Sequence, residues 1–174
     1  EFATEGMRFP YGDVALLNLN WSWRNAPYVV AQNTGAFLEI PGLLTEQHAV
    51  ANRDDAESYL ERLASYARQL DGETERLRSA AALGVIAPDF LLDKTLAQLR
   101  IAQGGDVSAW PLVASLVERT RGMGGTYGEH AARIAKDAVA PALARQLAEL
   151  EAHRRRATAD AGVWKLPHGD EYYA

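Results

Sequence analysis

Apolar residues recur every three or four positions along most of this chain, which is the period of an α-helix that packs through one face. The longest stripe follows Asn52 and extends for about seven turns. Asn52 or Asp54 can cap its start, because a short polar side chain accepts hydrogen bonds from the first turn. Gly84 can end it in the left-handed conformation that glycine tolerates. The apolar face consists of Tyr59, Leu60, Leu63, Tyr66, Ala67, Leu70, Thr74, Leu77 and Ala81.

Three further helices are predicted downstream. One begins at Pro88 and ends at Gly104, and a second opens at Asp106 or Ser108. The last runs from Thr126 to about 156, after a glycine-rich break at 122–125. Their predicted buried residues are Phe90, Leu92, Leu96 and Leu99, then Leu112, Val113, Leu116 and Val117, and finally Ile134, Ala138, Val139, Leu143, Leu147 and Leu150.

Two residues inside these predicted helices are unfavourable there. Gly72 should cost about 1 kcal/mol relative to alanine, so we expect a neighbouring helix to approach closely at that position. Pro141 lacks a backbone N–H and should kink the last helix or split it in two.

The two ends of the chain are less regular. Residues 1–51 are rich in Asn, Gly and aromatic side chains, and only Pro41 marks a short helix, as its first residue. Residues 158–174 form a predicted connecting loop, whereas 52–157 carry the long helices. The chain therefore predicts an all-α fold, a single bundle-like unit of about five helices over residues 1–174.

Composition excludes several classes of protein. A net charge of −5 and a pI near 5.4 argue against nucleic-acid binding, which needs clustered Lys and Arg. No cysteine is present, so disulfides, thiolate metal sites and a cysteine nucleophile are excluded. No apolar run approaches the length of a membrane span.

The search for catalytic chemistry finds no complete motif. A zinc peptidase motif H-E-x-x-H would need a second histidine four residues after the first, but Ile134 follows His130 at that spacing. The four histidines are scattered, so no metal-ligating residue and no catalytic residue is predicted in this chain. The glycines at 122–125 match no phosphate-binding pattern.

An aromatic segment near Pro27 leaves two interpretations open. Trp21, Trp23, Tyr28 and Gln32 crowd an irregular stretch, the kind of segment in which binding residues concentrate. The segment could be a local aromatic core or one wall of a substrate cleft.

Several segments resemble a known bacterial family. They are residues 27–32, 34–37, 40–41, 45–48, 59–63, 84–88, 138–143 and 162–173. The most specific is the last, with the pattern Trp-x-Leu-Pro-x-Gly-x-x-Tyr-Tyr. In order and spacing these segments are similar to the proteins grouped as domain of unknown function 885, and the resemblance covers nearly the whole chain.

This resemblance implies that the chain is part of a longer protein. Family members are typically longer, helical, often exported, and similar to zinc metallopeptidases whose H-E-x-x-H motif lies downstream of the Tyr-Tyr segment. By resemblance, the natural N-terminus and the catalytic half are both missing here. Zinc is expected in that downstream half, and no cofactor is expected in this chain.

The sequence supports two functional hypotheses. In the first, the chain is the non-catalytic portion of a zinc-dependent peptidase, supplying scaffold helices and one cleft wall. Its partners would be the downstream half and a peptide substrate, and its exposed apolar faces would favour self-association when it is alone. In the second, the chain is a helical interaction module without enzymatic activity. The candidate cleft residues are Tyr28, Gln32, His48, Tyr172 and Tyr173.

Overall fold

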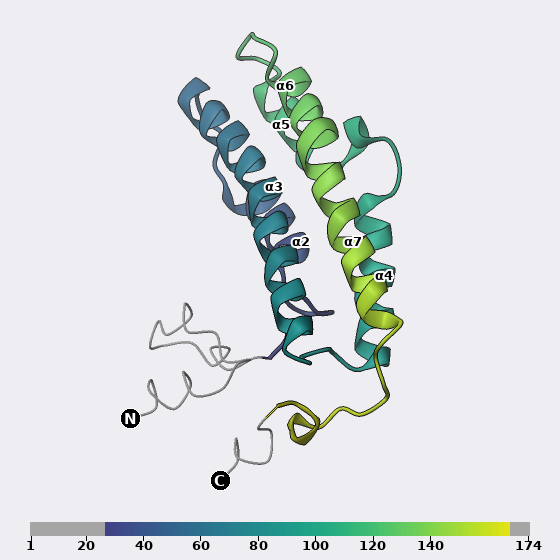
Figure 1. Cartoon of the computed structure of the whole chain (residues 1–174). Coiled ribbons are helices and arrows are strands. Elements are labelled where there is room, and N and C mark those ends of the chain that lie inside the picture. The colour runs from purple at the N-terminus through teal and green to yellow at the C-terminus, as the bar shows by residue number, and fades with distance from the viewer. Residues whose placement is uncertain (1–26, 168–174) are drawn as a thin grey trace, which may run out of the picture.

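The computed structural model describes residues 27–167, and their regular structure is helical (Figure 1). Within that range the β-structure is limited to one isolated bridge, between Ala31 and Thr34. The prediction of an all-α, bundle-like fold is therefore confirmed. The elements are α2 (Ala36–Gly42), the π-helical η2 (Leu43–Gln47), α3 (Arg53–Ala82), α4 (Asp89–Gln103), the 3₁₀ turn η3 (Val107–Ala109), α5 (Pro111–Thr120), α6 (Tyr127–Ile134), the π-helical η4 (Ala135–Val139), α7 (Ala140–Arg154) and the 3₁₀ turn η5 (Val163–Lys165).

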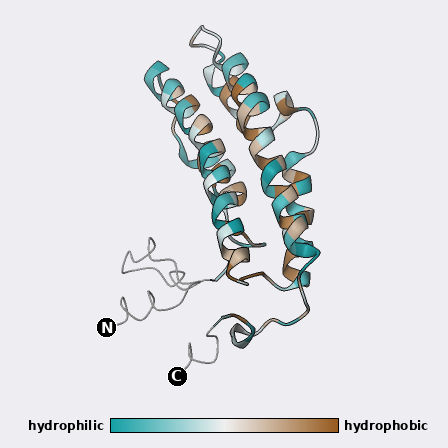
Figure 2. Cartoon of the chain, viewed as in Figure 1, coloured by the Kyte–Doolittle hydropathy of each residue, from teal (hydrophilic) through white to brown (hydrophobic). Residues whose placement is uncertain are grey.

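The long helices lie side by side along the molecule. α3 and α7 run in the same direction, while α4 and α5 return the chain between them (Figure 1). α7 packs on both α3 and α4, and α6 packs on α5 and α3. Each helix carries hydrophobic and hydrophilic residues in alternation along its length, as expected when one stripe faces the core (Figure 2).

The predicted stripe of α3 is the centre of this core. Eight of its nine residues are buried, and Leu60 is partly buried. The Asn52 side chain accepts a hydrogen bond from the Asp55 N–H, and Asp55 accepts one from the Asn52 N–H, so the two form a capping box. At the other end, Gly84 has φ +84° and the Val85 N–H donates to the Ala80 carbonyl, which stops the helix where the sequence predicted.

Two residues predicted to be buried are instead exposed. Phe90 is the second residue of α4 and lies at the end of the bundle, where no other helix of residues 27–167 covers it. Val117 comes directly after the fully buried Leu116, and one residue turns a helix by about 100°, so Val117 points away from the core.

The prediction of a close helix neighbour at Gly72 is wrong. A Cβ atom at Gly72 would meet nothing within 4 Å, because that side of α3 faces open space. The close approach lies at Gly128 instead, where a Cβ atom would come 2.5 Å from the Val117 Cγ2. Gly128 therefore permits the tight packing of α6 on α5.

Pro41 and Pro141 each have a π turn beside them. Pro41 was predicted to begin a helix, but α2 begins earlier, at Ala36, after Gly35 in a positive-φ conformation (123°). η2 comes after Pro41, and η4 precedes Pro141. The Ala140 N–H donates to the Ala135 carbonyl, five residues back, so α6 continues into α7 as one rod rather than breaking.

Ion pairs fasten α7 to both of its neighbours. Arg145 makes two 2.8 Å hydrogen bonds to Asp71 on α3, and Arg154 makes two to Asp93 on α4, at 2.6 and 3.1 Å. Arg78–Glu149 and Arg100–Glu151 add a pair on each side, both at 2.8 Å. Such exposed pairs contribute about 0–1 kcal/mol each.

None of the helices in 27–167 is both long and apolar enough for a membrane span.

Candidate functional site

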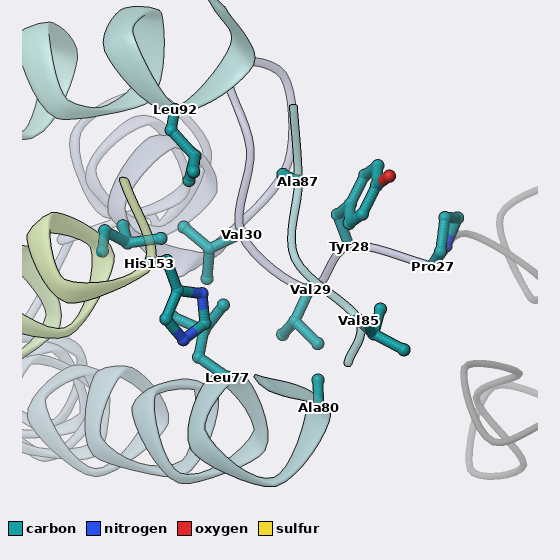
Figure 3. Close-up of a pocket in the computed structure, with 11 residues that line it drawn as sticks. Pro27, Tyr28, Val29, Val30, Leu77, Ala80, Val85, Ala87, Leu92 and His153 are labelled. Atoms are coloured by element: carbon teal, nitrogen blue, oxygen red, sulfur yellow. The ribbon is translucent and has the colours of Figure 1, made fainter. Parts of the chain in front are cut away.

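A small pocket lies where α3 and α7 end, beside the segment that enters the bundle (Figure 3). Its lining is largely apolar, and its free volume of about 10 Å³ is room for about one water molecule. The polar groups in the lining belong to Tyr28 and His153. The lining residues are Pro27, Tyr28, Val29, Val30, Leu77, Ala80, Val85, Ala87, Leu92, Leu150 and His153.

His153 is the most unusual group of this pocket. The side chain is buried near the end of α7, and its Nε2 atom has no hydrogen-bond partner. Glu149 Oε1 lies 3.3 Å from Nε2, close enough for a charge interaction but without hydrogen-bond alignment. Burial lowers the pKa of the imidazole, and the Glu149 carboxylate offsets part of that shift. His153 and Tyr28 are therefore the polar residues of an otherwise apolar lining, and the His153 ring lies beside the Glu149 carboxylate.

The structure places one predicted cleft residue, Tyr28, in this pocket, and another, Gln32, against α4. Tyr28 lines the pocket and is half-buried, and burial raises the pKa of its phenol. Gln32 lies in the short turn closed by Ala31 and Thr34, and its main-chain carbonyl accepts a hydrogen bond from Gln98 Nε2 at 3.1 Å.

His48 lies far from Tyr28. Its Nε2 donates to the Asp55 carbonyl near the start of α3, whereas Tyr28 lines the same pocket as Ala80, near the end of α3. Those α3 positions are 25 residues apart, which is about 37 Å at 1.5 Å per residue. Tyr28 and His48 therefore do not line one cleft within the described residues. Their roles as substrate-cleft residues stay predictions.

Both ring nitrogens of His48 have structural partners. Arg62 Nη1 donates to Nδ1 at 2.8 Å, so Nδ1 is the acceptor and Nε2 carries the proton given to the Asp55 carbonyl. The ring also meets Tyr59 edge-on, with centroids 5.3 Å apart. His48 thus fixes the turn between η2 and α3.

Arg119 completes that turn from α5. Its guanidinium donates to the main-chain carbonyls of Leu44 and His48, which are left unpaired at the end of the α2–η2 helix. It also lies 5.3 Å from the Tyr59 ring centroid. The Tyr59 hydroxyl donates to the Leu112 carbonyl at 2.6 Å. His48, Tyr59 and Arg119 therefore join the α2–η2 helix, α3 and α5, and the hydrogen bonds of their side chains go to partners within this cluster.

A buried carboxylate in the middle of the bundle was not predicted from the sequence. Glu73 Oε1 accepts the Ala36 N–H at 2.9 Å, and Oε2 accepts from Gln146 Nε2 at 3.1 Å. Burial raises the pKa of Glu73 and that of the neighbouring Tyr66, where the Glu73 charge adds to the shift. The signal was present, because position 73 falls on the apolar face of α3, three residues after Leu70.

The described residues do not assemble a metal centre. Within 27–167, no group of three or more His, Asp or Glu side chains could hold a metal ion. The candidates Tyr172 and Tyr173, with Trp21 and Trp23 of the aromatic segment, lie outside the described residues. The expectation of zinc in a downstream half is untested by this structure.

Comparison with known proteins identifies the family but not the activity. The fold is similar to the crystal structure of the putative lipoprotein from Colwellia psychrerythraea, with a TM-score of 0.77 and 19% sequence identity. That match covers 84% of this chain and 26% of the other, so the chain spans about a quarter of that protein. No curated protein matches. The model of a bacterial protein family of unknown function, DUF885, matches residues 8–174, and the chain therefore belongs to the DUF885 family.

Proposed function

We propose that this chain is the scaffold portion of a longer zinc-dependent peptidase and provides one wall of its substrate cleft. The observation that supports the scaffold part of the proposal is the match to about a quarter of a longer protein. The zinc peptidase part follows from the family resemblance of the sequence alone. The polar groups of the bundle agree with a scaffold role. His48 and Arg119 together hold the turn between η2 and α3, and Glu73 caps α2, so their hydrogen bonds are to structural partners.

In this proposal the metal ligands and the general base belong to polypeptide outside this sequence, where zinc would activate the water that attacks a peptide bond. The contribution of this chain is binding. The Tyr28 phenol and the Gln32 amide can both donate to and accept from a peptide backbone. Tyr28 lines the pocket at the end of α3, and Gln32 lies against α4 at Gln98.

The catalytic part of the proposal is tested on a full-length family protein that contains this chain. Loaded with zinc, the protein should cleave members of a peptide mixture followed by mass spectrometry. A chelator should abolish cleavage, and added zinc should restore it. A zinc-loaded protein that cleaves no peptide would overturn the peptidase assignment and favour the alternative, a helical interaction module without activity.

The cleft-wall part needs a separate test in the same protein. Tyr28→Phe removes only the hydroxyl, and should raise KM several-fold with little change in kcat if the phenol binds substrate in its ground and transition states alike. Tyr127→Phe is the matched control, because Tyr127 is also partly buried but begins α6 at the other end of the bundle. Equal KM values for the two variants would remove Tyr28 from the cleft.

A further inference from the structure

One end of the bundle is built from connecting segments instead of helix sides. The segment entering at Pro27, the α3–α4 connection and the segment after α7 meet there (Figure 1). The Asp89 N–H donates to the Thr158 carbonyl at 2.9 Å, which ties the second segment to the third. Val85 and Leu166 are buried together, and Tyr28 packs against them, which ties in the first. We call this the connection face.

Large apolar side chains remain exposed in the segments of this connection face. Leu83 is 51% exposed, Phe90 43% and Trp164 61%, and each belongs to a different local element. Exposed apolar groups that gather at one place on a soluble domain mark contact surfaces more often than scattered ones do. Trp and Phe are also residue types enriched in the cores of protein interfaces.

The sides of the bundle differ in how their exposed groups are distributed. The other large apolar side chains exposed in the described residues, Leu38, Ile101 and Val117, lie one each on α2, α4 and α5. Along α7, the surface shared with α3 and α4 is crossed by ion pairs such as Arg145–Asp71 and Arg154–Asp93. The aspartates of these pairs belong to a residue type that is depleted in the cores of interfaces, and each arginine already has its partner within the bundle. The connection face is therefore the better candidate for burial against another folded unit.

The path of the chain indicates what covers this face. The described polypeptide both enters and leaves the bundle there, at Pro27 and Pro167 (Figure 1). The Colwellia protein of the same fold has about three quarters of its chain outside the matched region. Polypeptide joined at this end is held at high effective concentration beside Leu83, Phe90 and Trp164.

We propose that the connection face is the interface on which the rest of a longer DUF885 protein packs, with Trp164 and Phe90 as its apolar anchors. This rests on the part of the proposed function that makes the chain one portion of a longer protein. It does not require that protein to be a peptidase. The interface would join the scaffold to the remaining portion directly beside Tyr28 and the His153 pocket.

The experiment compares side-chain accessibility in two proteins without any substitution. The 174-residue chain and a full-length family protein containing it are labelled with a photoactivated carbene, and the labelled residues are quantified by mass spectrometry. Trp164 and Phe90 should be labelled in the short chain and largely lose labelling in the full-length protein. Ile101 is the internal control, because it lies on the same helix as Phe90, is 80% exposed and is far from the connection face.

The alternative outcomes are distinct. Equal labelling of Trp164 and Phe90 in both proteins overturns the interface. Equal loss of labelling at Ile101 also overturns the interface, because labelling would then fall over the whole surface and not only at the connection face. Protection in the short chain that disappears on dilution assigns the face to a second copy, and overturns it as well. Since labelling is independent of cleavage, an inactive full-length protein with a protected Trp164 would defeat the peptidase assignment and leave the interface standing.

Discussion

The carboxylate of Glu73 in α3 accepts a hydrogen bond from the main-chain N–H of Ala36, the first residue of α2, across 2.9 Å. The N-terminus of α2 has no cap from its own segment, because Gly35 has no side chain. The cap comes from 37 residues away and from inside the core. A negative charge is favourable at a helix N-terminus, which offsets part of the cost of burying it.

Replacement of this carboxylate should destabilise the chain strongly. Glu73→Ala leaves the Ala36 N–H and the Gln146 amide without their partner, so we expect the free energy of unfolding to fall by about 2–3 kcal/mol. Urea unfolding followed by circular dichroism measures this. Glu75→Ala, two residues further along α3 and exposed, should change the free energy by less than about 1 kcal/mol. Equal losses in the two variants would contradict the capping role.

The raised pKa of Glu73 predicts a pH dependence. Because the folded state holds this proton more tightly than the unfolded state, the contribution of Glu73 is complete below the unfolded pKa and is lost as pH rises through the folded pKa. Glu73→Gln cannot titrate, so its stability should not show that decline. The measurement is urea unfolding of both proteins over a series of pH values, and parallel curves would refute the prediction.

For His153 we expect stability to depend on pH in the opposite direction, falling as the pH falls. Its folded pKa is lowered by burial, so the unfolded state binds the extra proton, and stability is lost as pH falls through the unfolded value near 6.5. His153→Gln does not titrate and should retain more of its neutral-pH stability at pH 5 than the wild type retains. An NMR titration of the imidazole should give a midpoint below 6.5, and a midpoint above it would show that the Glu149 charge outweighs burial.

Two helical glycines should respond differently to alanine. Gly72→Ala meets open space and should raise the free energy of unfolding by about 0.5–1 kcal/mol. Gly128→Ala has the same helix preference, but its Cβ would displace Val117, so no gain is expected. The double variant Gly128→Ala/Val117→Ala removes that clash, so the gain in the free energy of unfolding should appear relative to Val117→Ala alone. Thermal and urea unfolding test all three, and stabilisation by Gly128→Ala alone would show that α5 and α6 can separate at little cost.

The helices could be predicted because their information is local. The stripe of α3, the Asn52 cap and the Gly84 stop all depend on residues within a few turns, and all were found where expected. The predictions that were wrong depended on neighbours. Gly72 and Phe90 were judged from their own helix, whereas the side of the helix that another element covers is decided by the tertiary arrangement.

The site was less predictable for the same reason. Tyr28 was selected from a crowded aromatic segment, and it lines a pocket, but the other polar lining residue, His153, is 125 positions away. Glu73 was overlooked because an acidic residue within an apolar stripe usually lies at the solvent-exposed border of that stripe. Only the approach of Ala36 and Gln146 makes its burial favourable. The sequence has no short-range pattern that brings those residues together.

The π turn at Ala135–Val139 changes the direction in which the buried face of the rod points. Its additional residue rotates α7 by about 100° relative to an uninterrupted α-helix. α6 can therefore direct Ala131 toward the α5 side, while α7 directs Leu143 and Leu150 between α3 and α4. Removing one residue here would shorten no loop, yet it would turn the two halves of the rod out of alignment with their neighbours. In this chain, the number of residues between Ala131 and Leu143 therefore determines which neighbours the two halves of the rod face.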